Sequence, residues 1–458
     1  MTYPGIFRLF LLIPAAACLC AAQDTTELLN RMRAMEDRIK ALEAEVQSLK
    51  AQPAAVTPAA TPANPPAAAP PAAPPAAVAP AAPAAVPPEP MAGQGAPVQL
   101  GGAGGAAAKV LNPDISVIGD FVGAAGNARN RPTPSLEMHE SEVGFQEVID
   151  PYARADFFLT FGEQGVSLEE GYLTFTALPA ALQLKVGKMR AAFGKVNTLH
   201  NHVLPWVDRP LVNQNLVGGE DGIDDAGLSL SRILPAPKGI FMEGTAQIFR
   251  GDSENVFRAA KRSDLSTVEH LRIYHDINDN TNVDLGGSWS RGRSPFGPGW
   301  NQLYGFDGTL RWKPLSRSIY HSFVGRTELI WSRTVAGASI GNPFLGSVSN
   351  PLIRTPFGMY ASAEYQAARR WFLGVRYDNS QRVCGLPTDP ETTTDCSAAR
   401  FASLLRDQGG AFTVTYWPSE FSQIRGELRR VRYGEGLTAN EFLFQFMFSM
   451  GAHGAHPF

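Results

Sequence analysis

Two histidines in the stretch HNH, His200 and His202, are the residues of this sequence most typical of metal chemistry. Imidazole nitrogen binds zinc well, but a zinc site also needs further cysteine, histidine or carboxylate ligands at matching positions. No cysteine lies near the pair in the sequence, and the spacing assigns no carboxylate to it. We therefore expect no metal site and no cofactor, and we place both histidines in a loop.

The acidic stretch GGEDGIDDAG is a second candidate for metal binding, because carboxylates are preferred calcium ligands. Its spacing does not match an EF-hand, so the sequence predicts a solvated acidic loop. The one match to G-x-S-x-G, GASIG, lies in a long predicted connection and not in a strand-to-helix elbow, and no phosphate-binding glycine loop occurs in the sequence, which argues against an enzyme. The net charge of −3 argues against a nucleic-acid partner.

Charged residues that could contact a solute recur at every second position of short segments, with apolar residues between them. In ARADFFLTFG, for example, Arg154 and Asp156 alternate with apolar residues such as Phe157. This period of two is typical of a β-strand with one polar and one apolar face. Because acidic residues accompany the basic ones, the sequence predicts a mixed wall with weak charge selectivity. The basic residues on these polar faces are Arg154, Arg311, Arg326, Arg376, Arg425 and Arg429.

Segments of this kind fill residues 110–458, about sixteen in all, and short connections such as DINDN alternate with long ones. This alternation predicts an all-β fold, a transmembrane antiparallel β-barrel of about 16 strands. An arginine facing lipid at mid-bilayer costs about 2–4 kcal/mol, so the charged faces must point inward. A barrel of this size encloses an aqueous channel. A barrel plugged by its own N-terminus is the alternative, but no globular segment precedes the strands.

The last predicted strand, within EFLFQFMFSMGAHGAHPF, carries phenylalanine at four alternate positions, from Phe442 to Phe448. Its other face is mixed and partly polar. We expect the phenylalanine face to meet lipid beside the first strand, with the paired strand ending near Ala452. The terminal Phe458 resembles the signal read by the barrel-assembly machinery of Gram-negative outer membranes.

The sequence before the barrel predicts three further segments. Residues 1–22 read as a signal peptide, with lipid modification at Cys18 as the alternative. Apolar residues at heptad spacing in residues 23–50 predict a short α-helical coiled coil of two or three chains. Residues 51–109 form a disordered linker rich in alanine, proline and glycine, which follows because such a composition cannot bury a core. Because the first strand is expected to start at the periplasmic side, we expect the coil to lie in the periplasm.

Two long connections carry the remaining predicted site residues. Cys384 and Cys396 are the cysteines left after signal removal, so we expect them to form a disulfide within one outer loop. The connection at residues 195–223 mixes charged, aromatic and apolar residues, which suits a segment folded into the lumen as a constriction. Its candidate constriction residues are His200, His202, Trp206 and Asp208.

The stretch from ARADFFLTFG to GKMRAAFGKVN, followed by LPWVDRPLV, resembles the phosphate-selective porin family. The resemblance implies a trimeric sixteen-stranded outer-membrane barrel with lysines and arginines along an anion path. It covers roughly residues 110–458 and is clearest between residues 150 and 235. The basic residues that fall in the matching stretch are Lys185, Lys188, Arg190 and Arg209.

Together these features predict an outer-membrane porin for passive diffusion of small hydrophilic solutes or anions, with phosphate as one candidate. The alternative is a structural protein that ties the outer membrane to the cell wall through its coiled coil and linker. The expected partners are outer-membrane lipid, two further copies of the chain, the assembly machinery and, for the alternative, peptidoglycan.

Overall fold

A computed structural model of the protein describes residues 113–128, 134–162, 165–253, 255–336, 352–384 and 403–451. The predicted signal peptide, coiled coil, linker and chain end lie outside these residues, as does Cys396. The described helices are short: η1 (Pro179–Ala181), η2 (Val196–Thr198), η3 (Asn201–Val203) and α2 (Leu211–Leu216). No helix in the described part of the chain is long and apolar enough to cross a membrane.

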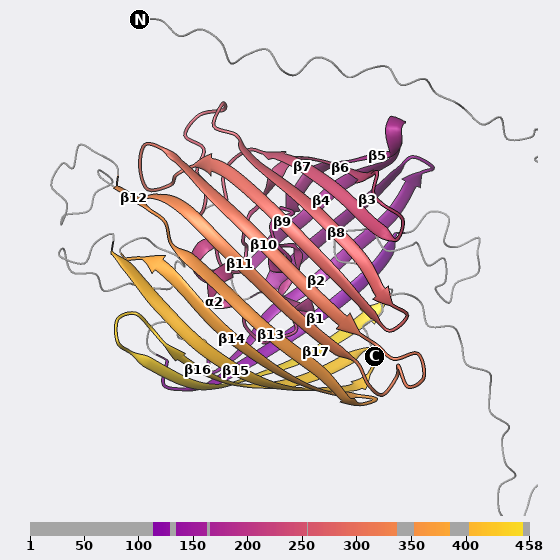
Figure 1. Ribbon diagram of the computed structural model, residues 1–458, viewed down its shortest axis with the longest axis vertical. Helices are drawn as coiled ribbons and strands as arrows, with labels where there is room; N and C mark the ends of the chain where they lie inside the picture. Colours follow the sequence, from indigo (N-terminus) through magenta and orange to yellow (C-terminus); the bar gives the residue numbers. More distant parts are fainter. Residues whose placement is uncertain are drawn as a thin grey trace, which may run out of the picture. The chain divides into compact units, whose positions relative to one another are not determined.

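The strands form one sheet (Figure 1). They are β1 (Asp114–Gly126), β2 (Leu136–Asp150), β3 (Ala153–Gly162), β4 (Gly165–Leu178), β5 (Leu182–Arg190), β6 (Asp224–Leu234), β7 (Ile240–Phe249), β8 (Ser266–Asn278), β9 (Thr281–Arg293), β10 (Trp300–Trp312), β11 (Phe323–Ala336), β12 (Leu352–Arg354), β13 (Phe357–Ala368), β14 (Trp371–Val383), β15 (Leu404–Ser419), β16 (Ser422–Arg432) and β17 (Thr438–Gly451).

The sheet closes on itself because β1 pairs with both β2 and β17, and every pairing is antiparallel. In β11, Thr334 pairs with Arg354 of β12 and Trp331 with Phe357 of β13, in one continuous register. The two segments are thus one barrel strand, interrupted at Pro356, which has no N–H for the ladder. The barrel therefore has sixteen strands, which confirms the predicted fold.

The two faces of the strands are divided as the alternation predicts. Phe157, Phe306 and Val375 lie on the outside and are 45%, 44% and 53% exposed, whereas Asp156 and Arg376 on the inner face are each only 4% exposed. In β17, Phe442 and Phe446 are exposed, whereas Leu443 and Gln445 on the inner face are buried. The outer face is thus the apolar surface that a lipid-embedded barrel needs.

The connections also alternate in length. Two-residue turns join β2 to β3, β8 to β9 and β13 to β14, whereas residues 191–223 join β5 to β6 and residues 250–265 join β7 to β8. The link from β3 to β4 is an exception, because β3 ends at Gly162 and β4 already begins at Gly165. The connection from β5 to β6, the third on the long-loop side, is the longest of the described connections. It starts directly after Arg190, four residues earlier than predicted.

The seam between β1 and β17 has a distinct outer surface. Gly119 of β1 pairs with Phe448, and Gly123 pairs with Phe444. Both glycines lie under the facing ring, since a Cβ added to either would come within 2.3 Å of a ring carbon. Phe121, between the two glycines, packs against Phe444 at 5.9 Å between ring centroids. Aromatic rings thus cover the backbone where the barrel closes.

Candidate functional site

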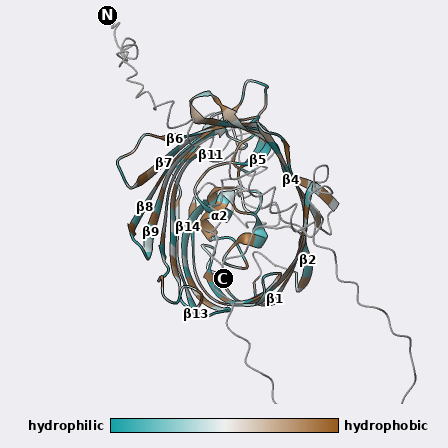
Figure 2. Ribbon diagram, turned by 90° about the vertical axis from the view of Figure 1, so that its right-hand side faces the viewer, coloured by the Kyte–Doolittle hydropathy of each residue, from teal (hydrophilic) through white to brown (hydrophobic). Residues whose placement is uncertain are grey.

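The connection between β5 and β6, residues 191–223, lies inside the barrel, and we refer to it as the luminal loop. Figure 2 shows α2, which belongs to it, enclosed by the ring of strands. Residues of this loop form hydrogen bonds to inward-facing side chains of strands on all sides of the barrel. Three anchor points, at Glu328, Asp208 and His200, carry most of the charged contacts.

The first anchor is Glu328 of β11, which is 1% exposed. One of its carboxylate oxygens accepts hydrogen bonds from the backbone N–H groups of Lys195 and Val196, each at 2.6 Å, and the other accepts one from Asn213 Nδ2. Gly194 lies against this carboxylate with φ of +61°, a left-handed conformation that glycine adopts without strain. The start of the loop is thus turned toward the wall by one buried acid.

The second anchor is Asp208, whose two partners follow it by 168 and 221 residues in the sequence. It accepts a hydrogen bond from Arg376 of β14 at 2.6 Å and one from Arg429 of β16. Each arginine keeps a further carboxylate, Asp378 for Arg376 and Glu441 for Arg429. Charge-assisted bonds of this kind are stronger than neutral ones, so this cluster fixes the middle of the loop to the C-terminal strands.

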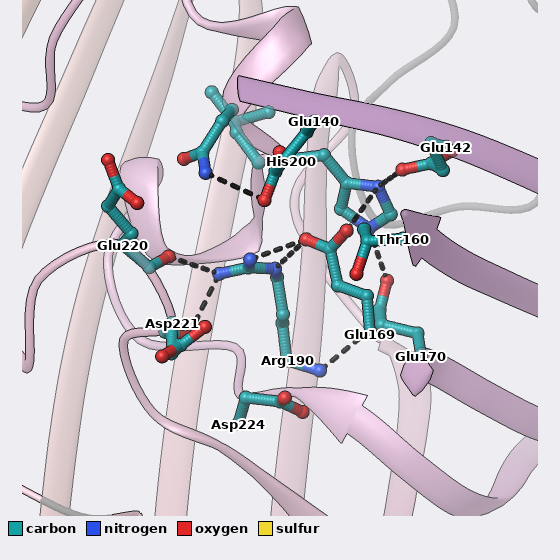
Figure 3. A network of polar contacts seen from close by, with 12 residues as sticks. Glu140, Glu142, Thr160, Glu169, Glu170, Arg190, His200, Glu220, Asp221 and Asp224 are labelled. Atoms are coloured by element: carbon teal, nitrogen blue, oxygen red, sulfur yellow. Dashed lines mark hydrogen bonds and ion pairs between the residues drawn. The ribbon is translucent and has the colours of Figure 1, made fainter. Parts of the chain in front are cut away.

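The third anchor is His200, shown in Figure 3. Its Nδ1 lies 2.6 Å from Glu142 Oε2 of β2, and its Nε2 lies 2.8 Å from Glu170 Oε2 of β4. Glu169, the residue before, has no pairing partner on β3, because the register shifts between Leu159 and Phe158 there. Such a bulge lets two successive side chains reach the same face, and both glutamates are directed to the histidine.

Arg190 closes this cluster on its other side. Its guanidinium binds Glu169 Oε1 at 2.5 Å and the backbone oxygens of Glu220 and Asp221 at 3.0 and 2.9 Å (Figure 3). The last residue of β5 therefore holds the returning end of the luminal loop. Glu169 uses only one oxygen in this contact.

Between the anchors the loop packs on an apolar core inside the barrel. Val212 and Trp206 of the loop belong to one buried apolar cluster with Ile330 and Tyr360 of the wall, and all four are at most 3% exposed. The Trp206 ring meets the Tyr360 ring edge-on at 5.2 Å between centroids, and Arg376 lies over the Trp206 ring at 5.1 Å. Burial of apolar area stabilises the inserted loop in addition to its polar anchors.

Burial and neighbouring charges act in opposite directions on the loop residues. Burial raises the pKa of Asp208, but Arg376 and Arg429 outweigh it and hold that pKa well below its usual range. Burial lowers the pKa of His200, whereas its bonds to Glu142 and Glu170 raise it well above the ordinary value. The arginines thus favour the ionised form of Asp208, and the glutamates favour the protonated form of His200.

The structure brings some of the sequence-predicted site residues together and keeps others apart. Arg376, Arg429 and Asp208 form one cluster, and Arg425 donates to the backbone oxygens of Leu204 and Trp206. Arg209 donates hydrogen bonds within the loop, to backbone carbonyl oxygens and to Asn201 Oδ1. Seven of the ten predicted basic residues are paired with carboxylates: Arg154, Lys188, Arg190, Arg311, Arg326, Arg376 and Arg429.

Lys185 lies apart from these pairs, with its Nζ 4.6 Å from the centre of the Tyr172 ring. Cys384 is disulfide-bonded, and the predicted partner Cys396 lies outside the described residues.

Sequence reasoning missed the apolar wall residues that receive the loop. These residues stand singly in rows that are otherwise polar, and that irregularity is the signal that could have revealed them. They are Val268, Leu303, Ile330 and Tyr360. It also missed Glu142 as the partner of the HNH histidines, because the two lie 58 residues apart.

No profile of a known protein family matches the sequence. A curated protein of Aquifex aeolicus (strain VF5), described as uncharacterized, is 28% identical over 411 residues, which cover 76% of this chain and 81% of that protein.

Solved structures similar to this chain are outer-membrane porins and channels. The anion-selective porin of Comamonas acidovorans has a TM-score of 0.49 at 10% identity, covering 74% of this chain and 99% of that one. The outer-membrane channel DcaP of Acinetobacter baumannii has a TM-score of 0.47 at 12% identity, covering 74% and 96%. The trimer form of OmpT of Vibrio cholerae has a TM-score of 0.47 at 10% identity, covering 74% and 100%.

Proposed function

We propose that the protein is an outer-membrane porin of a Gram-negative bacterium, which lets small hydrophilic solutes or anions diffuse passively through its barrel. The observation that carries this proposal is the closed sixteen-stranded barrel with charged residues facing inward around an anchored luminal loop. A barrel of this strand number is wide enough to enclose a water-filled path. The luminal loop, including His200, His202, Trp206 and Asp208, acts as its constriction.

The charge pattern favours weak selectivity over a dedicated phosphate path. In the stretch that resembles the phosphate-selective porins, Lys188 and Arg190 are paired with Asp224 and Glu169, and Arg209 donates to loop carbonyl oxygens. Such groups are compensated and offer a passing anion little free positive charge. We therefore propose a general solute channel with at most a modest preference for anions.

Reconstitution in planar lipid bilayers tests this function. We expect stepwise conductance increases and, in a salt gradient, a reversal potential close to zero. A large reversal potential of anion sign that inorganic phosphate reduces would instead indicate a phosphate-selective channel. Absence of conductance steps from a folded, heat-modifiable barrel would refute the porin function.

We also propose that the protein works as a homotrimer inserted by the barrel-assembly machinery, as the resemblance implies. Light scattering of the detergent-solubilised protein measures the number of chains directly. A mass corresponding to one chain would refute the trimer without affecting the channel function.

A second role, a tether to the cell wall, is favoured by the heptad pattern of residues 23–50 and the extended linker that follows. Deletion of residues 23–107 separates the two roles. A pure porin keeps its conductance and leaves the envelope intact, whereas loss of a tether makes cells sensitive to detergent even though conductance is preserved.

A further inference from the structure

The donor atoms around His200 have the composition of a metal site that no part of the channel function requires. Glu142, His200 and His202 are all buried, and one ligand atom from each lies within 4.8 Å of the others. Nδ1 of His200 and Nδ1 of His202 both face Glu142 Oε2, at 2.6 and 3.6 Å. The two imidazole rings are nearly perpendicular, with centroids 5.6 Å apart, so neither ring blocks the other's nitrogen.

Glu169 supplies an independent sign of a missing ligand. This side chain is 7% exposed, and its Oε2 is buried with no hydrogen-bond partner among the described residues. That oxygen lies 3.9 Å from Nδ1 of His200. Because a buried acceptor without a partner is costly, such an atom calls for an explanation. A cation between Glu169 and the histidines would supply one.

Three of the six distances among the four donor atoms can be compared with those of a tetrahedral ion. Zinc lies about 2.0–2.2 Å from nitrogen and oxygen ligands, so two ligands of one tetrahedral ion are about 3.4 Å apart. The separations of 3.6 and 3.9 Å are close to this value. The contact of 2.6 Å between His200 and Glu142 must open, as a hydrogen bond does when a metal takes the place of its proton.

The surrounding residues are placed as supporting partners of such a site. Nε2 of His200 lies 2.8 Å from Glu170, and a ligating histidine in proteins usually donates its other ring N–H to a carboxylate. Arg190 binds Glu169 Oε1 and leaves Oε2 free to face the histidines. These contacts fix the direction of two of the four ligand side chains.

We propose that Glu142, Glu169, His200 and His202 bind one divalent transition-metal ion of the zinc type, which joins the luminal loop to β2 and β4. Two imidazole nitrogens and two carboxylate oxygens balance the charge of a divalent ion and favour zinc over magnesium or calcium, which prefer oxygen ligands alone. The ion would cross-link the loop to strands other than β14 and β16, which hold Asp208. The site goes beyond the proposed channel function and does not depend on it.

Zinc binding to the full-length, detergent-solubilised protein tests the site. After chelator treatment and its removal, titration calorimetry should give one zinc per chain, and magnesium should give no binding. His202→Ala and Glu142→Gln should each weaken zinc affinity at least 10-fold. His270→Ala is the matched control, because His270 also faces the lumen but is bonded to Ser288 of β9. It should bind zinc like the wild type.

Two measurements keep the test decisive. Heat-modifiable mobility in gels reports whether each variant is folded, so that a failed barrel is not counted as a lost site. Zinc should also slow amide exchange of residues 198–204 at least 10-fold in the wild type but not in folded Glu142→Gln. No saturable zinc binding by the folded wild type, or equal loss in the His270 variant, would overturn the proposal and leave His200 as a hydrogen-bonded anchor alone. Because binding and exchange are measured without ion flow, these results do not depend on conductance.

Discussion

At the scale of single residues, the luminal loop depends on buried charges whose partners come from distant strands. Asp208 is 14% exposed at its side chain and joins two arginines, whereas Glu328 is 1% exposed and holds two backbone N–H groups. Breaking a buried ion pair leaves an uncompensated charge, which costs more than the pair contributes. A substitution of Asp208 therefore removes two ion pairs, whereas a substitution of Glu328 removes hydrogen bonds to backbone N–H groups.

Asp208→Asn should detach the middle of the loop. We expect a loss of about 3 kcal/mol, the lower end for a broken buried ion pair, because Arg376 and Arg429 each keep another carboxylate. Amide exchange of residues 206–210, followed by mass spectrometry, should accelerate about 100-fold. Asp279→Asn in the exposed β8–β9 turn is the matched control. Equal exchange in both variants would show that Asp208 is not an anchor.

The same residue gives a pH dependence with a defined sign. Because the folded-state pKa of Asp208 is below its unfolded value of about 3.9, its stabilisation is present above that value and is lost only as the pH falls through the lowered pKa. Wild-type loop protection in residues 206–210, corrected for intrinsic exchange, should thus be the same at pH 8 and pH 5. A decrease already at pH 5 would contradict the pairing.

Glu328→Gln tests the first anchor with a smaller expected loss of stability, because the amide keeps one acceptor oxygen. A hydrogen bond to a charged group contributes about 1 kcal/mol more than a neutral one. We expect exchange at the amides of Lys195 and Val196 to accelerate about 10-fold, while distant strands stay protected. Glu420→Gln, in an exposed turn, controls for the change of charge, and an equal effect there would remove the special role of Glu328.

At the scale of elements, β17 shows how far a period of two predicts a strand. Its even-numbered residues face outward and its odd-numbered ones inward, as the sequence indicates, and the strand ends at Gly451, one residue before the predicted end. The alternation is reliable here because each side chain's face follows directly from its position in the strand.

Phe446→Arg tests whether the outer face of β17 contacts lipid. An arginine there should lower the free energy of unfolding in lipid vesicles by about 2–4 kcal/mol if the position lies near mid-bilayer. Phe446→Leu, which keeps an apolar surface, should change it much less. Similar losses for both, measured by denaturant titration, would place this face against protein or water instead.

Two features of the barrel wall were not predicted from the sequence. The bulge at Glu169 breaks the alternation of β4 so that neighbouring glutamates both face the lumen. The isolated apolar residues Ile330 and Tyr360 occupy polar rows because the loop brings Trp206 and Val212 to them. A local pattern predicts neither feature: the bulge interrupts the alternation within β4, and Ile330 and Tyr360 lie more than 100 positions from Trp206 and Val212 in the sequence. The luminal position of the loop itself was expected from its length and composition.

At the scale of the whole molecule, closure rests on the pairing of the first and last strands. Gly123→Ala would bring a methyl group within 2.2 Å of a Phe444 ring carbon and 2.9 Å of the Ser135 backbone oxygen. We expect a loss of about 1–3 kcal/mol in the free energy of unfolding, as in other overpacked sites. Gly308→Ala, at an outward position with ordinary contacts of 3.5 Å and more, should be neutral.

A double variant separates steric conflict from other effects. Adding Phe444→Ala should reduce the cost of Gly123→Ala, because the ring that the methyl group displaces is then missing. If the two losses simply add, the ring does not lie over Gly123 in solution.

The contacts of the luminal loop also bear on the order in which the barrel is assembled. His200 reaches partners only 58 and 30 residues away, whereas Asp208 reaches Arg376 and Arg429 across 168 and 221 residues. Loop-closure entropy grows with separation, so we expect the near contacts to form before the far ones. The far contacts join β14 and β16 to the same loop that binds β2, and these strands lie on either side of the seam where Gln445 bonds to Asp120 across 325 residues. We therefore expect the luminal loop to assist the closing of the ring as well as to occupy its interior.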